Sequence, residues 1–419
     1  MEPGRASPTP YAYGHTNGRS QTSQPSPLTT SDRDSYSERT PASYGNDYVV
    51  PAKPARGTGP DAIGYSRAPR QNSSENARTD VRPFYSGESQ GLEFLFDLVS
   101  PDRTTKGLHY ATPTATYRAK RTMKLPRHPC PQMPPAIVQQ ELIRCFFHYV
   151  WPAMPIIDPK DFLLAWYQED RQVSPLLLWC VLFAGASYIN SEALKAHELP
   201  TRKTLKEQFY QNAKDIYDAR EEPEKTVLIQ SAILLAAWYI DLEDRDGVHH
   251  WIGIAISLAH TIGIHRKDSY DTVHPPPFSS CERRIWRCLW WSIYYRDAWA
   301  SLGFGRPMKT NSEDCDAPML TVEDIVSPDL DEIPADLQGF LPPNLRELAH
   351  LMINFLELSM ILERILKSYY RPRSGVPTIQ KIERDERDIL ACRNKMVIPQ
   401  FDDAPVLALH SLHIRAYYT

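Results

Sequence analysis

The sequence lacks the features that define several common protein classes. Its seven cysteines are scattered, no C-x-x-C pair occurs, and the closest two, Cys281 and Cys288, are seven residues apart. This pattern fits neither a disulfide framework nor a zinc site, and it indicates reduced thiols inside a cell. The apolar runs at 176–189 and 227–240 fall short of the ~20 residues that a membrane-spanning helix needs, and the N-terminus has no apolar signal segment. We therefore expect no membrane contact.

Several catalytic signatures are also missing. The sequence has no H-E-x-x-H, no Gly-rich phosphate loop that ends in Lys-Ser or Lys-Thr, and no G-x-G-x-x-G. His249 and His250 are adjacent, so on a helix they point about 100° apart and do not converge on one metal. His260 and His265 flank Gly263, where contact with carbonyl groups at a helix end is the expected role. We predict that the protein is not an enzyme.

Composition divides the chain into three parts. Residues 1–83 are rich in Ser, Thr, Pro, Gly and Asn and poor in aliphatic side chains, so we predict a disordered segment. Residues 84–133 are predicted to be a linker, whose apolar start at 84–98 suggests a short helix or extended piece docked on the main body. The linker carries a basic cluster, which is either a solvated charge run or a nuclear-import or phosphate-contacting patch. The cluster comprises Arg118, Lys120, Arg121, Lys124 and Arg127.

From residue 134 to residue 419 the apolar pattern is helical, and no run sustains a period of two residues. Prolines open several of the helices. Gly263 is expected to end one helix, and Ser279 with Glu282 forms a capping box at the start of another. The expected helices cover 136–150, 159–168, 175–189, 203–220, 226–240, 249–262, 280–304, 344–370, 379–392 and 405–419. We predict an all-α, multi-helix domain.

The segment 281–307 contains a dense group of aromatic side chains at helical spacing, which we interpret as the middle of a core. These side chains are Trp286, Trp290, Trp291, Tyr294, Tyr295 and Trp299. A ligand or partner groove lined by them is the alternative. Asp297 lies on the same helical face, and a buried carboxylate needs partners. We expect Arg306 to form a bidentate ion pair with Asp297 across the 303–305 bend, with contact to a small-molecule effector as the alternative.

Four blocks of this sequence, in order, resemble one family. They are FFHYVWPAMPIIDPKDF, TVLIQSAILLAAWY, HHWIGIAISLAHTIGIHR and CERRIWRCLWWSIYYRDAWASLGFGRP. Together they resemble the middle regulatory domain of the fungal zinc-cluster transcription factors, also called the xylanolytic-activator regulatory domain. The flanking stretches YSGESQGLEFL and EDCDAPML look similar to the cutinase-gene regulators. The resemblance marks a set of signature core residues, namely Trp290, Trp291, Asp297, Gly305, Arg306 and Pro307.

The resemblance implies a nuclear regulator of RNA polymerase II genes. Full-length members bind DNA through a zinc-binding cysteine cluster, often as dimers, so the implied partners are DNA, the transcription machinery or a small-molecule effector, and a second copy of the chain. The cysteine cluster is absent here, so zinc is expected only in a missing N-terminal module, and this chain should need no cofactor. We expect truncation at both ends. Any DNA contact by this chain should be weak, salt-sensitive, independent of DNA sequence and made through residues 118–127.

Two alternatives come from other classes of protein. One is an interaction protein that has lost DNA binding but keeps the same helical body. The other, more remote, is an all-α enzyme with an aromatic cavity for a small molecule. Such an enzyme would need converging acidic metal ligands, which Asp402-Asp403 and the 243–246 turn do not supply.

Overall fold

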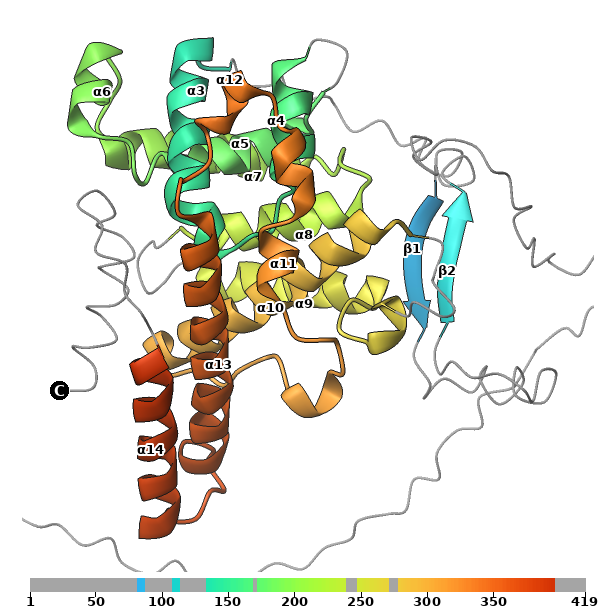
Figure 1. Cartoon of the computed structure of the whole chain (residues 1–419), viewed down its shortest axis with the longest axis vertical. Coiled ribbons are helices and arrows are strands. Elements are labelled where there is room, and N and C mark those ends of the chain that lie inside the picture. Colours follow the sequence, from blue (N-terminus) through green and yellow to red (C-terminus); the bar gives the residue numbers. More distant parts are fainter. Residues whose placement is uncertain are drawn as a thin grey trace, which may run out of the picture. The chain divides into compact units, whose positions relative to one another are not determined.

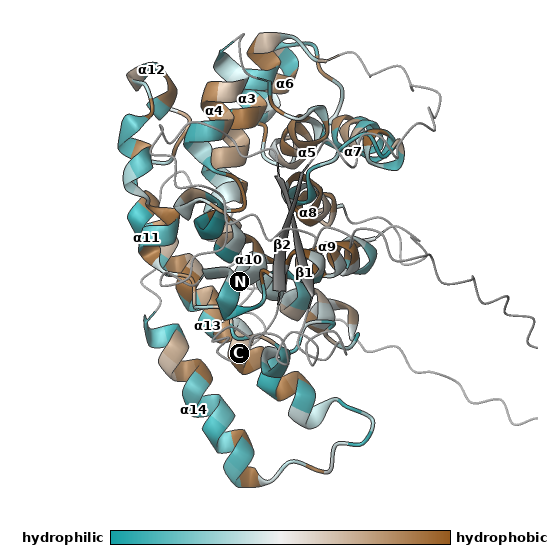
Figure 2. Ribbon diagram, turned by 90° about the vertical axis from the view of Figure 1, so that its right-hand side faces the viewer, coloured by the Kyte–Doolittle hydropathy of each residue, from teal (hydrophilic) through white to brown (hydrophobic). Residues whose placement is uncertain are grey.

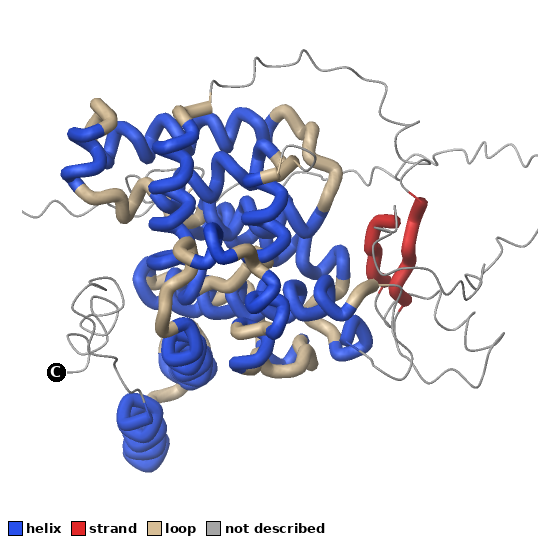
Figure 3. The backbone as a smooth tube through the Cα atoms, turned by 45° about the horizontal axis from the view of Figure 1, so that its top comes forward, coloured by secondary structure: helices blue, strands red, loops and turns tan. Residues whose placement is uncertain are grey.

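The computed structural model describes residues 81–86, 108–113, 133–168, 172–238, 247–270 and 278–395, which belong to one compact unit, Asn76–Thr419. Helices dominate this part of the chain (Figure 3), which confirms the predicted all-α body. Residues 1–80 of the predicted disordered segment 1–83, the basic cluster at 118–127 and the expected helix at 405–419 lie outside the described residues. The last three residues of that segment, 81–83, are described and are extended instead of disordered, because they pair with a second strand. None of the described helices combines the length and the apolar character needed to cross a lipid bilayer.

The helices follow one another closely along the chain (Figure 1). The longer ones are α3 (Ala136–Cys145), α4 (Pro159–Tyr167), α5 (Pro175–Gly185), α7 (Arg202–Asp218), α8 (Lys225–Leu235), α9 (Val248–Ile262), α10 (Ser280–Phe304), α13 (Leu345–Tyr369) and α14 (Ile379–Lys395). Shorter helices are α6 (Ser191–Ala196), α11 (Val322–Ile325) and α12 (Ala335–Gln338), with single turns η1 (Phe146–Val150), η2 (Trp151–Ala153), η3 (Lys267–Tyr270), η4 (Ser312–Asp314) and η5 (Pro328–Glu332). The predicted helix at 136–150 therefore ends in a π-helical turn, η1.

Two strands precede the helical body and were not predicted. β1 (Val81–Ser86) pairs antiparallel with β2 (Leu108–Pro113), in a register that places Phe84 opposite Tyr110. Of the two structures expected from residue 84, a short helix or an extended piece, the described residues 84–86 adopt the extended one. Isolated strand pairs are difficult to recognise because a six-residue strand gives too few alternations to stand out.

Local sequence signals explain where several helices begin and end. Asp158 caps α4 by accepting a hydrogen bond from the Asp161 amide at 2.9 Å, and the predicted capping box of Ser279 and Glu282 starts α10. α9 ends at Gly263, whose φ of 77° is left-handed, and the Ile264 amide bonds back to the Ala259 carbonyl. The predicted turn at Gly263 is therefore confirmed, and Ile264 is buried behind it.

The core lies where α5, α8, α9 and α10 meet. α5 and α8 are apolar on nearly all sides (Figure 2), as expected of helices that are surrounded by others. α7 packs on α5, α9 packs on α8, and α13 packs on α10. α10 thus touches both α9 and α13, and this central place sets the geometry of its aromatic and charged side chains.

Candidate functional site: the aromatic helix and its buried carboxylates

Five of the six aromatic side chains predicted to form the core are buried, and the sixth, Trp299, is half-buried and packs against them. Trp286, Trp290 and Tyr294 are at most 2% exposed. Two indole N–H groups fasten neighbouring segments, because Trp291 donates to the Pro318 carbonyl at 2.7 Å and Trp299 donates to the Ser359 hydroxyl at 3.0 Å. These bonds hold the segment after α10 and the long helix α13 against the aromatic stripe. The alternative of an open aromatic groove finds no support in this burial.

Asp297 is fully buried, with 0% of its surface exposed. Its Oδ2 atom accepts hydrogen bonds from the backbone amides of Lys309 (2.8 Å) and Thr310 (2.6 Å) and from the Thr310 hydroxyl (2.8 Å). Its Oδ1 atom has no partner among the described residues. Burial raises the pKa of Asp297 above its ordinary value, and the bonds from Thr310 and Lys309 oppose this only in part.

The predicted ion pair between Asp297 and Arg306 is wrong. Arg306 is exposed, and its guanidinium lies 5.4 Å from the centre of the Phe304 ring instead. The reason is the turn at Gly305, which has a left-handed φ of 62° and ends α10. This turn sends Arg306 outward and brings the amides of Lys309 and Thr310 back to the carboxylate. The predicted bend is therefore fixed onto the helix, but by neutral donors instead of a cation.

A second buried carboxylate, Glu363 of α13, lies close to the same loop. It accepts a hydrogen bond from the Tyr294 hydroxyl, a second from the Ser312 amide at 2.9 Å, and pairs with Lys367 at 2.6 Å. Burial disfavours its charge, but Lys367, Tyr294 and Ser312 outweigh that effect and lower the pKa of Glu363. Asp297 and Glu363 thus hold the two ends of the 309–312 segment. The sequence offered no signal for Glu363, since its partners are far apart along the chain.

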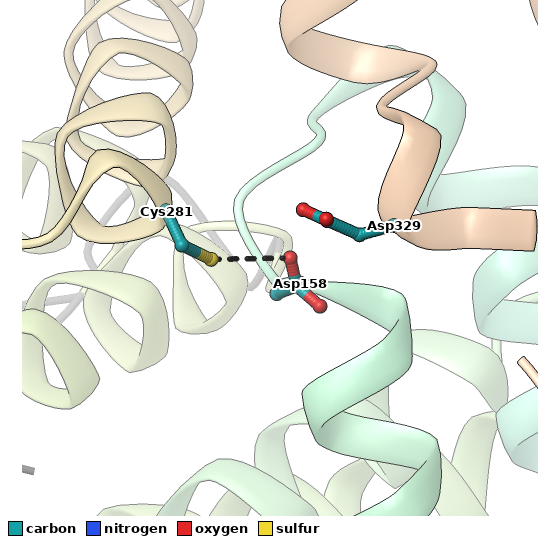
Figure 4. Close-up of side chains that lie close together, drawn as sticks. All are labelled: Asp158, Cys281 and Asp329. Carbon is teal, nitrogen blue, oxygen red and sulfur yellow. Dashed lines mark hydrogen bonds between the residues drawn. The ribbon is translucent and has the colours of Figure 1, made fainter. Parts of the chain in front are cut away.

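The start of α10 carries an ion-pair cluster. Asp158, Cys281 and Asp329 lie together (Figure 4), with potential metal-ligating atoms within 4.8 Å of one another. The Arg284 guanidinium already contacts all three, at 2.5 Å from Asp158, 3.1 Å from Asp329 and 3.5 Å from the Cys281 sulfur. Burial, reinforced by the nearby charge of Asp158, raises the pKa of the Cys281 thiol to about 11, so it stays protonated near neutral pH. The three side chains therefore form a binding site for the Arg284 guanidinium, and they fit a metal ion poorly.

The histidines singled out by the sequence take two different places. The rings of His260 and His265 are 4.6 Å apart, and both lie within 6 Å of the Trp290 ring. His250 lines a shallow cavity of about 570 Å³ beside α9, together with Ile254, Leu258 and Lys309. None of the four histidines belongs to a group of three or more potential metal ligands among the described residues.

Residues 87–91 match the G-x-S-x-G pattern of serine hydrolases. That pattern supplies a nucleophile when it forms a tight turn between a strand and a helix of a mostly parallel sheet. Here it follows β1, whose only partner among the described strands is antiparallel, and residues 87–107 lie outside the described part. The match therefore lacks the context that would identify a nucleophile.

The fold and these contacts define a helical domain in which the signature aromatic and acidic side chains hold the structure together. The sequence profile of the fungal specific transcription factor domain matches residues 143–388. The chain belongs to this family, which confirms the resemblance noted from its sequence. The match runs from the last residues of α3 into the middle of α14 and includes all of the signature residues.

Curated relatives agree with the family. The chain is 32% identical to cutinase transcription factor 1 beta of Fusarium vanettenii over 290 residues, which are 67% of this chain and 32% of that protein. It is 34% identical to the acetamidase regulatory protein of Emericella nidulans over 197 residues, which are 46% of this chain and 23% of that protein. It is 32% identical to transcription factor cpaR of Aspergillus oryzae over 256 residues, which are 59% of this chain and 42% of that protein. The chain thus spans less than half the length of each of these relatives. No solved structure matches it.

Proposed function

We propose that the protein is a transcription regulator, and that its helical body is the regulatory domain that controls the protein's activity through contacts with other molecules. The observation that carries this proposal is the family match across 143–388, in a body whose signature residues Trp290, Trp291 and Asp297 are buried. Relatives that are named transcription factors or regulatory proteins support the same role. In this proposal the role is non-enzymatic; relatives named as transcription factors support this, as do the structural hydrogen bonds of Asp297 and Glu363.

Sequence-specific DNA binding belongs, in this proposal, to a zinc module outside the matched region, since the described residues contain no cysteine cluster. Nuclear localisation follows from the regulatory role. The basic cluster that includes Arg118 and Arg121 is the proposed import or phosphate-contacting segment, and it lies outside the described residues. We divide the chain as the sequence suggested, into 1–83, 84–133 and 134–419.

A reporter experiment tests the proposal. The whole chain is fused to a heterologous DNA-binding domain in a fungal host, and the output of a reporter gene that carries the matching site is measured. We expect the fusion to raise or lower the output relative to the DNA-binding domain alone. The Arg306→Gln fusion should behave as the wild type, because Arg306 is exposed and not paired with Asp297. A fusion that is folded and nuclear but leaves the reporter unchanged would contradict the proposal.

A further inference from the structure

The loop that joins α13 to α14 combines exposed apolar side chains with unpaired positive charge. We call residues 370–382 the hairpin tip; it projects beyond the other described helices (Figures 1 and 2). Four large apolar side chains are exposed there, to 74% for Tyr370, 96% for Val376, 74% for Ile379 and 48% for Ile382. Exposed apolar side chains are normally scattered singly over a surface, so this concentration indicates a contact surface.

The charge of the hairpin tip has one sign. Arg371, Arg373 and Lys381 are exposed, and no acidic residue occurs from Tyr370 to Ile382. None of these three cations has a salt bridge within the described residues. The neighbouring cations on the hairpin are different: Arg364 pairs with Asp385 and Asp388, and Lys367 pairs with Glu363. The positive charges of the tip therefore form no ion pair within the described fold and can pair with acidic groups of another molecule.

The hairpin beneath the tip is well anchored. Arg364 joins α13 to Asp385 of α14 at 2.7 Å, and the Tyr369 hydroxyl donates to the same carboxylate. Pro372 and Pro377 restrict the backbone of the loop between the two helices. A loop held in this way loses little conformational freedom when it binds, and so it retains more of its interaction energy.

We propose that the hairpin tip is a docking surface for an acidic protein segment that also carries apolar side chains. The three cations would pair with the carboxylates of the segment, while Val376 and Ile379 would be covered by its apolar side chains. Apolar exposure on this scale favours a protein partner over a nucleic acid, whose backbone offers phosphates but little apolar surface. The inference does not depend on the proposed transcriptional role, because it concerns the purified chain alone.

The chain itself supplies a suitable probe. A synthetic peptide with the sequence of residues 321–338 has six acidic side chains, six aliphatic ones larger than alanine and no basic one. Its binding to the intact chain is followed by fluorescence anisotropy. We expect an affinity on the order of 10 μM at low salt, as for a small transient interface, and weaker binding as salt rises. A peptide with Asn and Gln in place of Asp and Glu should bind at least ~10-fold more weakly.

Two pairs of substitutions locate the site. Arg371→Glu with Arg373→Glu, and Val376→Ser with Ile379→Ser, should each weaken peptide binding by ~10-fold or more, without a change in melting temperature, because all four side chains are exposed. Matched controls at exposed positions elsewhere are Lys195→Glu with Lys203→Glu, and Ile137→Ser. The controls should leave the affinity within about twofold of the wild type.

Four outcomes would overturn the proposal. The intact chain could fail to bind the acidic peptide, or the tip substitutions could weaken binding no more than the controls. Random duplex DNA could bind the tip more tightly than the peptide does, which would make the site a phosphate site. Finally, strong hydrogen-exchange protection of residues 375–380 in the chain alone would show that another part of the protein already covers the tip.

Discussion

The two ends of α10 keep charged side chains inside the protein in opposite ways. At its start, the Arg284 guanidinium forms ion pairs with Asp158 and Asp329, and Arg287 pairs with Asp324. Both of these arginines are thus paired with acidic side chains from other segments of the chain. At its end, the Asp297 carboxylate meets no cation. It accepts its hydrogen bonds from the backbone of Lys309 and from the backbone and hydroxyl of Thr310.

The difference shows that a buried carboxylate requires hydrogen-bond donors, and that a counter-charge is only one way to supply them. Backbone amides are another, and a left-handed turn such as the one at Gly305 can bring two of them to one carboxylate oxygen. Every residue except proline carries such a donor. The sequence could therefore show that Asp297 needs partners, but it could not show which ones, because the charge of Arg306 is visible in a sequence and the direction of a backbone amide is not.

The largest expected effect comes from Asp297→Ala. The substitution leaves the amides of Lys309 and Thr310 without their acceptor, and we expect it to lower the free energy of unfolding by about 3–5 kcal/mol in urea denaturation. Asp297→Asn should cost less, since its carbonyl oxygen can keep some of these bonds. Arg306→Gln should leave the denaturation midpoint unchanged. If Arg306→Gln proved as damaging as Asp297→Ala, an ion pair would have to exist after all.

Arg284→Met is the corresponding test at the other end of α10. It leaves Asp158 and Asp329 close together without their cation, and we expect a loss of about 2–3 kcal/mol, since Asp329 is partly exposed and can be hydrated. Asp329→Asn in the Arg284→Met background should recover part of the loss by removing the like-charge repulsion. No recovery in that double variant would mean that packing of the guanidinium, and not its charge, holds this end together.

Long, strongly patterned elements of this fold were predictable, and long-range partners were not. The capping box at Ser279 and the glycine turn at Gly263 are local signals, and both appear as expected. The burial of Trp290 follows from its helical spacing alone. In contrast, Glu363 joins Ser312, which is 51 residues away, and no local pattern encodes such a pair. The strands β1 and β2 were missed because each is too short to show a period.

The two buried carboxylates should respond to pH with opposite signs. The pKa of Glu363 is lowered from its ordinary value of 4.5, so its stabilising effect is complete above that pH and is lost as the pH falls through the folded-state value. The pKa of Asp297 is raised from 3.8, so its protonated form is favoured in the folded state. That contribution is complete below pH 3.8 and is lost as the pH rises through the folded-state value.

Glu363→Gln should therefore flatten the rise of stability with pH in the acid range, and it should cost about 1–2 kcal/mol at neutral pH, because the ion pair with Lys367 is lost. In the wild type, the contribution of Asp297 to the free energy of unfolding declines as the pH rises, and Asp297→Asn should remove this decline. Both slopes are measured from urea denaturation between pH 3 and pH 7. If the two variants altered the pH profile in the same direction, one of the two carboxylates would have the wrong environment in this structure.

The smallest expected effect concerns the left-handed turn at Gly305, which brings the backbone donors to Asp297. Gly305 has a left-handed φ of 62°, and a Cβ added there would meet nothing within 4 Å, so Gly305→Ala should cost only the backbone strain, about 1–2 kcal/mol. Gly303, two residues earlier in α10, also has open space around it but is helical. Gly303→Ala should thus stabilise the protein, by about 0.5–1 kcal/mol. Opposite shifts in melting temperature for two such similar substitutions would establish the turn, and equal shifts would mean that Asp297 meets its donors without it.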